Sequence, residues 1–335
     1  MEPIIQTGFL VRAYNPCSWY RLLEPAGAYP GAKIILAPNG FTDYVKSQSA
    51  HCQLMQMGYV CQSDEIEFIG WLKRQGIKVA VDYDDNMFQM CPEPNREMVV
   101  RALALANLVT VPTEFLARLY GRHAKTTVAI IPNRLDLKYW TPNFKRPDPA
   151  EQIIAYSGSR CHTRDFAAVA AEAVWEVLRM RKTAKFRVIG CDPLSIPPDV
   201  ADRVQELPWQ PVHDHVNAIR GLNADIAIAP LVPDWFNRGR SELKWLQFGA
   251  LGCPMVASDC EPYDQVVADG LTGFLAGDKK EWVDRLLMLV DSPRLRLEIG
   301  SSAANLVHWK YDLRDDAALR RRIYQTLFSA ETKTA

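Results

Sequence analysis

Short apolar runs rich in β-branched residues alternate with longer amphipathic stretches along most of the chain. Runs this short have the length of buried strands, and the longer stretches repeat their apolar positions at the helical period. In the first part of the chain the pattern predicts strands at residues 7–12, 33–37, 59–62, 78–81, 108–111 and 128–131. It predicts helices at 64–75, 95–106 and 113–120, with Ser63, Asn95 and Thr113 as the capping side chains.

The alternation stops at residues 138–149, where proline and charged residues follow one another without a period, as is typical of a linker. Beyond it the pattern predicts strands at 153–156, 186–189, 203–207, 226–229 and 254–257, and helices at 165–181, 212–221, 241–249, 281–290 and 312–328. We therefore expect an N-terminal domain at 1–140, a linker at 141–150 and a second domain at 151–308. The C-terminal helix, within 309–335, is expected to pack back toward the N-terminal domain.

Strand followed by helix, repeated, is the pattern of a parallel sheet that helices cover on both faces. A chain of 335 residues is too long for one ordinary domain and suits two. The sequence thus predicts an α/β protein with two doubly wound, Rossmann-like domains that face each other across a cleft. Ligands of such sheets bind beyond the carboxyl ends of the strands, so the cleft is the expected site.

The charges of the chain balance, since 39 lysine and arginine residues oppose 39 aspartate and glutamate residues. This balance argues against bulk DNA or an anionic membrane surface as the main partner. The N-terminus lacks the basic start and apolar run of a signal peptide, and no apolar run is long enough to span a membrane. The eight cysteines form no Cys-x-x-Cys pair, which favours reduced thiols and a cytoplasmic enzyme.

The segment 236–259 carries the most informative polar residues of the chain. A loop ending in Arg240 leads into Ser241, a residue type that caps helices, and a predicted helix follows. The amides and the positive dipole end of a helix start bind anions, and Arg240 and Lys244 lie within one turn of this start. This combination suits a leaving nucleotide diphosphate. A surface helix with incidental basic residues is the alternative.

From about residue 158 to 307 the chain resembles the C-terminal, donor-binding domain of the GT4-type glycosyltransferases, which have the GT-B fold. The resemblance rests on an ordered series of motifs at 158–165, 240–247, 249–259, 262–263 and 269–273. It implies transfer of a sugar from a nucleotide diphosphate sugar to an acceptor hydroxyl, with retention at the anomeric carbon. It also implies a donor site without an essential metal or other cofactor, in which Arg240 and Lys244 stabilise the departing diphosphate. The expected donor contacts are Gly158, Ser159, Arg160, Trp209, Ser241 and Gln247.

The chain departs from this family at two positions. Many members carry two glutamates eight residues apart around the donor helix, where this chain has Gly239 and Gln247. Gln247 can still hydrogen-bond a ribose diol through its carbonyl oxygen. The departures favour one alternative, a non-catalytic binding or structural protein on the same fold. A sugar-nucleotide epimerase is a second alternative, because the fold alone does not fix the reaction. A dinucleotide dehydrogenase is disfavoured, because no Gly-x-Gly-x-x-Gly follows a predicted strand.

Two loops of the N-terminal half are expected at the mouth of the cleft. Trp19, Tyr20 and Arg21 follow the first strand and are assigned to the acceptor side, where the rings could stack on a sugar or equally join the core. The second loop begins at Asp82, after the fourth predicted strand.

This second loop places three carboxylates together, at Asp82, Asp84 and Asp85. Charges clustered in this way need a metal, an arginine or a catalytic task to offset them. Asp82-x-Asp84 matches the metal-binding motif of GT-A glycosyltransferases, but the two-domain pattern and the resemblance favour GT-B. We therefore expect no metal, and we assign Asp84 and Asp85 to orienting or deprotonating the acceptor hydroxyl. A structural cluster, offset by arginine or capping backbone amides, is the alternative.

The acceptor stays open among a glycan, a lipid-linked glycan and a modified nucleic acid base. The Tyr-Arg loop and the Asp-Asp-Asn turn resemble those of phage and bacterial glycosyltransferases from surface-polysaccharide settings. Some phage enzymes of this kind glycosylate hydroxymethylated DNA bases, which the balanced charge does not favour.

Three further predictions concern burial. The arginine run 320–322 is expected on a solvated helix face, and His213 and His215 are expected to be exposed. Simple packing is expected for Trp140, Trp175 and Trp282.

Overall fold

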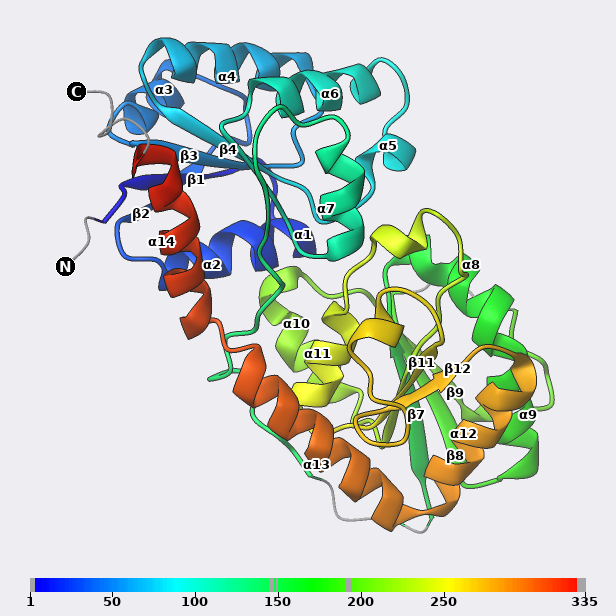
Figure 1. Cartoon of the computed structure of the whole chain (residues 1–335). Helices are drawn as coiled ribbons and strands as arrows, with labels where there is room; N and C mark the ends of the chain where they lie inside the picture. Colours follow the sequence, from blue (N-terminus) through cyan, green and yellow to red (C-terminus); the bar gives the residue numbers. More distant parts are fainter. Residues whose placement is uncertain (1–3, 145–147, 149, 191–194, 330–335) are drawn as a thin grey trace. The chain divides into compact units, whose positions relative to one another are not determined.

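The computed structural model describes residues 4–144, 148, 150–190 and 195–329 (Figure 1). The chain divides into two compact units. The N-terminal unit comprises Met1–Asp136, Gly239–Ser241 and Asp312–Ala335, and the C-terminal unit comprises Leu137–Arg238 and Glu242–Tyr311. The predicted linker at 141–150 lies partly outside the described residues.

The described part of the N-terminal unit contains a six-stranded sheet in the order β2-β1-β3-β4-β5-β6, in which every pair of neighbours is parallel. The strands are β1 (Thr7–Val11), β2 (Ala32–Leu36), β3 (Leu54–Gly58), β4 (Lys78–Asp82), β5 (Leu108–Val111) and β6 (Val128–Ile130). The helices are α1 (Pro16–Ser18), α2 (Glu24–Ala28), α3 (Asp43–Ser49), α4 (Ser63–Arg74), α5 (Met87–Met90), α6 (Asn95–Leu105), α7 (Glu114–Gly121) and α14 (Arg314–Ser329). Apolar clusters fill both faces of this sheet.

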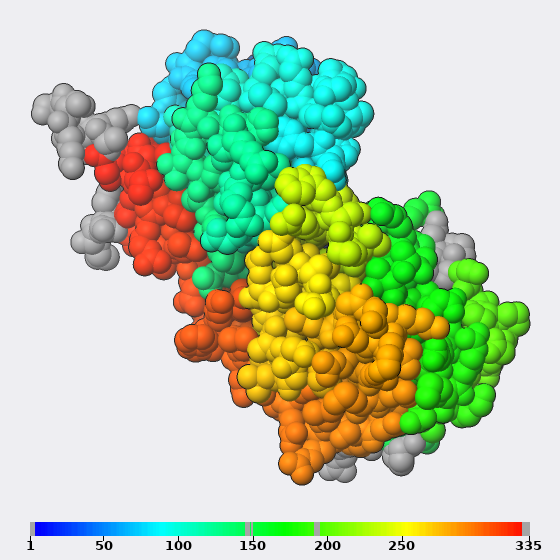
Figure 2. All heavy atoms as spheres, turned by 45° about the vertical axis from the view of Figure 1, so that its right-hand side comes forward, coloured from blue at the N-terminus to red at the C-terminus, as the bar shows by residue number. Residues whose placement is uncertain are grey.

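The described part of the C-terminal unit contains a second parallel six-stranded sheet, in the order β12-β11-β10-β7-β8-β9. Counted from β7, this is the doubly wound order 3-2-1-4-5-6. The strands are β7 (Gln152–Ser157), β8 (Ala184–Ile189), β9 (Val204–Leu207), β10 (Ile226–Ala229), β11 (Met255–Ser258) and β12 (Phe274–Ala276). The helices are α8 (Thr163–Asp165), α9 (Ala171–Met180), α10 (His215–Gly221), α11 (Leu243–Ala250), α12 (Lys279–Asp291) and α13 (Pro293–Lys310). Figure 2 shows α12, in orange, at the surface of this unit.

The two parallel sheets confirm the predicted α/β fold class with Rossmann-like domains. Helix caps were predicted less well. Thr113 caps α7 by accepting a hydrogen bond from the amide of Leu116, as expected. The caps predicted at Ser63 and Asn95 are wrong, because these residues are the first of α4 and α6. A capping box between Gln62 and Glu65 begins α4 instead.

The strand predicted at 59–62 is also wrong, because β3 lies just before it. Its centre is Gln56, a buried polar residue that interrupts the apolar run and donates a hydrogen bond to Thr110 Oγ1 over 2.9 Å. Tyr59 has a φ of 56°, which ends the extended backbone at Gly58. Elements α1 to α3, α5, β12 and α13 were not predicted from the sequence.

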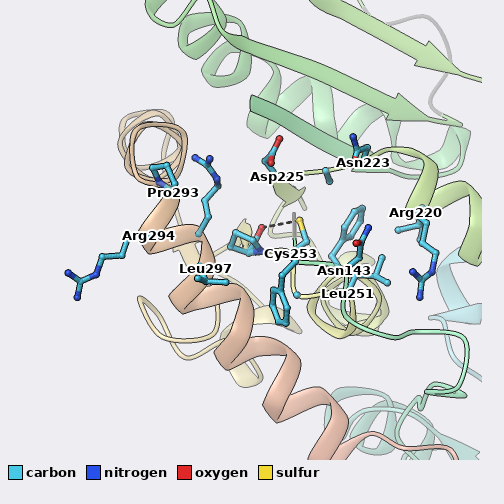
Figure 3. Close-up of a pocket in the computed structure, with 16 residues that line it drawn as sticks. Asn143, Arg220, Asn223, Asp225, Leu251, Cys253, Pro293, Arg294 and Leu297 are labelled. Carbon is cyan, nitrogen blue, oxygen red and sulfur yellow. Dashed lines mark hydrogen bonds between the residues drawn. The ribbon is translucent and has the colours of Figure 1, made fainter. Parts of the chain in front are cut away.

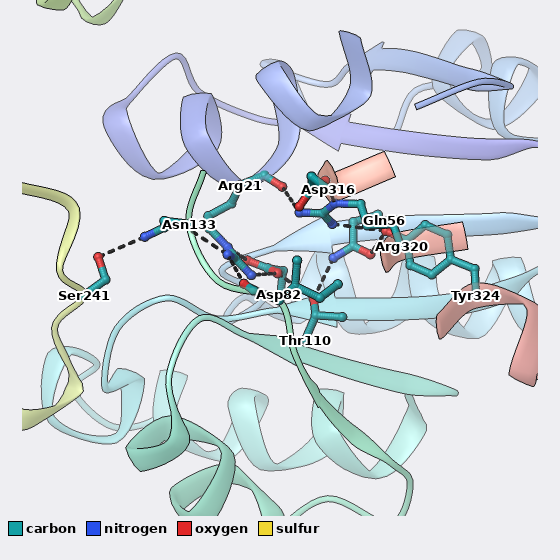
Figure 4. A network of polar contacts seen from close by, with 10 residues as sticks. Arg21, Gln56, Asp82, Thr110, Asn133, Ser241, Asp316, Arg320 and Tyr324 are labelled. Atoms are coloured by element: carbon teal, nitrogen blue, oxygen red, sulfur yellow. Dashed lines mark hydrogen bonds and ion pairs between the residues drawn. The ribbon is translucent and has the colours of Figure 1, made fainter. Parts of the chain in front are cut away.

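A buried polar network joins α14 to the N-terminal sheet (Figure 4). Arg320 is 1% exposed, pairs with Asp316 and donates to the hydroxyl of Tyr324. That hydroxyl donates to Gln56 Oε1 of β3 over 3.0 Å. The prediction of a solvated arginine run is therefore wrong for Arg320, whose side chain faces the sheet. Trp140, Trp175 and Trp282 are buried, as predicted.

The same network contains a buried ion pair between Arg21 and Asp82. Arg21 Nε and Nη2 donate to the two carboxylate oxygens of Asp82 over 2.9 and 2.8 Å. Its Nη1 donates to the carbonyl of Ile131 and to Asn133 Oδ1. Thr110 donates its hydroxyl to Asp82 as well. This two-pronged geometry fixes the residues after β1 against the ends of β4 and β6.

We predict that Arg21→Met destabilises the N-terminal unit by about 3–5 kcal/mol, because it leaves the Asp82 charge buried without its partner. Urea unfolding measures this loss. Arg181→Met is the matched control, since Arg181 makes a similar two-pronged pair with Asp291 at the surface. Loss of an exposed pair costs far less, because water solvates both charges when the pair is broken. Equal losses in the two variants would contradict the importance of the buried pair.

Candidate functional site

The candidate residues of the C-terminal unit lie at the carboxyl ends of its strands. Strands β7 and β10 are neighbours in the sheet. From β7 the next strands, β8 and β9, are added on one side, and from β10 the next strands, β11 and β12, are added on the other. Such a switch point is where doubly wound sheets bind ligands. Gly158 follows β7 directly, and Gly190 follows β8.

Four side chains at this switch point, Asn237, Asp165, His162 and Lys244, contact one another in that order. Lys244 Nζ lies 3.4 Å from His162 Nε2, and His162 Nδ1 lies 3.4 Å from Asp165 Oδ2. Asn237 and the amide of Val232 donate to Asp165 Oδ1 over 2.7 and 3.2 Å. Burial opposes the charge of Asp165, but these hydrogen bonds hold the pKa of its carboxyl below the ordinary value. The carboxylate thus orients His162, and His162 positions Lys244.

A second group lies one helical turn further along α11. Gln247 is buried and hydrogen-bonds His215. Burial lowers the pKa of His215 to about 4, so its imidazole is neutral at physiological pH. The prediction that His215 is exposed is wrong, because the side chain turns inward, whereas His213 is exposed as predicted.

Trp209 lies beside this group with one side open. Its ring centroid is 5.7 Å from that of His215, and 40% of the residue is exposed. Gly190 has a φ of 81°, and a Cβ there would lie 2.3 Å from the indole ring. Only glycine lets the indole rest on this backbone. The exposed part of the ring can stack on a flat ligand.

The loop after β7 holds the other predicted donor contacts. Gly158 donates its amide to the carbonyl of Ile189, and a Cβ there would lie 3.0 Å from the Tyr156 ring. Ser159 is half-buried and Arg160 is exposed. Glycine at this place therefore lets the loop pass close to the strand ends.

The predicted role of Ser241 as a helix cap is wrong. Helix α11 begins at Leu243, and its N-cap Glu242 makes no side-chain capping bond. The Ser241 hydroxyl accepts a hydrogen bond from Asn133 Nδ2 over 2.9 Å instead. Ser241 and Arg240 belong to the N-terminal unit. The joint contact of Arg240 and Lys244 with a diphosphate stays a prediction.

In the N-terminal unit the three clustered carboxylates have different surroundings. Asp82 is paired with Arg21. Asp85 is buried, lies 2.8 Å from Arg240 Nη1 and accepts a hydrogen bond from the Tyr59 hydroxyl. Asp84 Oδ1 is buried and has no hydrogen-bond partner among the described residues. Burial and the Asp85 charge raise the pKa of Asp84 to about 7.

Cys17 lies next to these two carboxylates. Its Sγ and one oxygen each of Asp84 and Asp85 lie within 4.8 Å of one another. Burial and the two carboxylates raise the pKa of the Cys17 thiol well above its ordinary value, so it stays protonated and is a poor metal ligand. Because Asp82 is held by Arg21, the Asp82-x-Asp84 motif does not offer two carboxylates to a metal.

The predicted loop around Trp19, Tyr20 and Arg21 is helical, since these residues form part of a π-helical stretch at Trp19–Leu23. Tyr20 and Arg21 are buried, and Trp19 is half-buried. The asparagine at the start of α1, Asn15, caps the helix by accepting from the Ser18 amide. The acceptor-side assignment of the three residues stays a prediction.

Several residues of these groups were not singled out from the sequence: Cys17, Tyr59, Thr110, Asn133, Asp165 and Asn237. Asp165 and Asn237 lie 72 positions apart, and Arg21 and Asn133 lie 112 apart. No local pattern connects such pairs. Only the sheet topology brings them together.

None of the described helices is long and apolar enough to cross a membrane. Residues 151–292 match the family model described as Glycosyl transferases group 1. No curated protein sequence matches the chain.

Solved structures resemble the chain over almost its whole length. Sucrose-phosphate synthase from Thermosynechococcus elongatus superposes with a TM-score of 0.71 at 16% identity, covering 97% of this chain and 99% of that one. HepE from Anabaena, solved with UDP and glucose, gives 0.71 at 14% identity, covering 97% and 100%. A glycosyltransferase from Rickettsia africae gives 0.65 at 13% identity, covering 98% and 99%. Residues 151–292 are therefore similar to the Glycosyl transferases group 1 family, and the chain has the two-domain GT-B fold.

Proposed function

We propose that this chain transfers a sugar from a nucleotide diphosphate sugar to an acceptor hydroxyl with retention at the anomeric carbon. The observation that carries the proposal is the pair Lys244 and Gln247, three residues apart on α11 and so on one face of the helix. His162 lies beside the ammonium group, and His215 hydrogen-bonds the amide. A cation and a hydrogen-bonding group are thus held in place at the switch point of the family domain.

Lys244 has the task of stabilising the departing diphosphate. As the bond between the anomeric carbon and the phosphate oxygen breaks, negative charge grows on that oxygen. The Lys244 ammonium and the first amides of α11 offset this charge without reorganisation. No protein nucleophile is needed, because the acceptor hydroxyl attacks from the face that the diphosphate leaves, and the phosphate accepts its proton.

The remaining donor groups have separate tasks in this proposal. The open side of Trp209 stacks on the nucleobase, and Gln247 binds the ribose hydroxyls through its carbonyl oxygen. The complex of HepE with UDP and glucose supports a uridine diphosphate donor as the first to test.

Asp84 orients the acceptor hydroxyl. Asp82 and Asp85 are each paired with an arginine, whereas Asp84 Oδ1 is left without a described partner. A carboxyl with a pKa near 7 can accept a hydrogen bond from a hydroxyl when ionised and can give up or take a proton near neutral pH.

A sugar-nucleotide epimerase is a second candidate, favoured by one observation. A putative UDP-N-acetylglucosamine 2-epimerase from Listeria monocytogenes shares this fold, with a TM-score of 0.58 at 12% identity over 99% of this chain and 98% of that one. Proton NMR of the products separates the candidates. Transfer gives a new glycoside, whereas epimerisation inverts one carbon of the donor without an acceptor.

We predict that Lys244→Met weakens UDP binding at least tenfold and lowers turnover of the cognate UDP-sugar by about 10²–10³-fold, because it removes the charge that faces the leaving group. Isothermal titration and a UDP-release assay measure the two effects. Lys280→Met is the control, since Lys280 is exposed on α12 and paired with Asp284. Unchanged UDP affinity in Lys244→Met would contradict the donor site.

We predict that Asp84→Asn lowers transfer by about 10²-fold or more while UDP affinity stays unchanged. The variant should also melt at a higher temperature than wild type at pH 8, and this difference should shrink as the pH falls toward 4. The raised pKa of Asp84 means that the folded state favours the protonated carboxyl, so stability that is fully present below the ordinary pKa of 3.8 is lost as pH rises from there to about 7. A neutral asparagine avoids this loss.

Glu67→Gln, at an exposed position of α4 in the same unit, is the control for removing one carboxylate. It should change neither transfer nor the pH dependence of melting. Full transfer activity in Asp84→Asn would contradict the acceptor role, and a lower melting temperature at pH 8 would contradict the buried, protonated carboxyl.

A further inference from the structure

A cavity of about 230 Å³ lies at the end of the C-terminal sheet where its strands begin (Figure 3). Asp225 and Cys253 line it, just before the starts of β10 and β11. The candidate donor residues lie beyond the carboxyl ends of the same parallel strands. The cavity therefore lies at the amino ends of the strands, and the proposed donor site lies at their carboxyl ends.

Two glycines fix one wall of the cavity. Gly252 has a φ of 76°, and a Cβ there would lie 2.4 Å from the Phe144 ring. A Cβ on Gly300 of α13 would lie 2.1 Å from the Gly252 carbonyl oxygen. Helix α13 and the turn after α11 thus meet backbone to backbone, which leaves little room for collapse of the wall.

Most of the lining is apolar. Phe144, Phe248, Leu251, Pro254 and Leu297 contribute rings and aliphatic groups. An apolar cavity of ~150 Å³ holds a benzene ring. The space here is larger and admits a ring with a short polar arm.

The buried cation of the cavity is Arg296, in the first turn of α13. It is 7% exposed, and its Nη1 donates to the carbonyls of Leu289 and Val290 over 2.6 and 2.9 Å. Among the described residues, no carboxylate lies within ion-pair distance of it, and Nε and Nη2 make no hydrogen bond. Burial lowers the pKa of this guanidinium below its ordinary value, although the negative charge of Asp225 raises it in part. A buried charge with so little compensation favours an anionic ligand.

The other arginines of the cavity are already engaged. Arg294 pairs with Glu298 over 2.7 Å, and Arg220 donates to the carbonyls of Tyr139 and Thr141. Asp225 accepts the amide of Ile153 over 2.8 Å and adds a negative charge to the lining. This charge disfavours a dianion such as phosphate and leaves room for one carboxylate, whose two oxygens match a guanidinium edge.

We propose that this cavity is a second ligand site, which binds a small carboxylate with a ring-sized apolar body, its carboxylate paired with Arg296. The proposal does not depend on the sugar donor or on the transfer reaction.

Phenylacetate and its uncharged amide, phenylacetamide, test the site on the full chain by ligand-observed NMR and titration. Phenylacetate should bind saturably, and the amide should bind at least tenfold more weakly. Saturating UDP should leave phenylacetate binding intact. Absence of phenylacetate binding up to ~10 mM, equal binding of the amide, or displacement by UDP would each overturn the proposal.

Variants place the ligand in the cavity. Arg296→Gln should abolish binding, but the residue is buried and the variant can fail to fold. Leu297→Glu changes a residue that is 54% exposed and sets a carboxylate at the cavity, so it should weaken phenylacetate binding at least tenfold. Met288→Glu, at a 44% exposed position of α12 outside the lining, is the control and should bind as wild type. Wild-type binding by Leu297→Glu would overturn the proposal.

Discussion

Three carboxylates stand within four residues at the end of β4, and the N-terminal unit is organised around the cost of keeping them from water. Arg21 forms a two-pronged ion pair with Asp82 and also donates a hydrogen bond to the backbone just after β6. Arg240 forms an ion pair with Asp85. Arg320, on α14, donates to the backbone carbonyl of Arg21 and so connects the C-terminal helix to the same centre. Asp84 forms no ion pair with an arginine among the described residues, and burial together with the Asp85 charge raises the pKa of its carboxyl to about 7.

Two buried histidines support the candidate donor residues of the C-terminal unit. Asp165 orients His162 beside Lys244, and Gln247 is hydrogen-bonded to His215, which burial keeps neutral. The neutral imidazole of His215 supports the Gln247 amide without adding charge to the site. Gln247 carries no charge, so the neutral imidazole of His215 suits it as a hydrogen-bonding partner.

The alternation of strands and helices was enough to predict the fold class, and the motif series in residues 158–307 predicted the glycosyltransferase resemblance. Both are confirmed, whereas the GT4 subgroup and a phage setting stay predictions. The failures have a shared cause. Gln56 and His215 are polar residues whose partners lie far away in the chain, so the sequence pattern predicted a strand break at Gln56 and an exposed position at His215. Arg320 pairs with Asp316 on its own helix, but what buries it is the packing of that helix on the N-terminal sheet, which the sequence pattern does not show. Helix α13 was missed because Gly300 lowers helix propensity where packing against Gly252 requires it.

Burial and the charge of Asp85 give Asp84 a raised pKa, and its proposed acceptor role depends on this raised pKa. Carbon-13 NMR of the carboxyl groups in the full chain measures this directly, with the Asp84 signal assigned by its loss in Asp84→Asn. We predict a pKa of about 7 for Asp84. A midpoint in the ordinary aspartate range, at about 4, would contradict this and would leave the cluster a structural one.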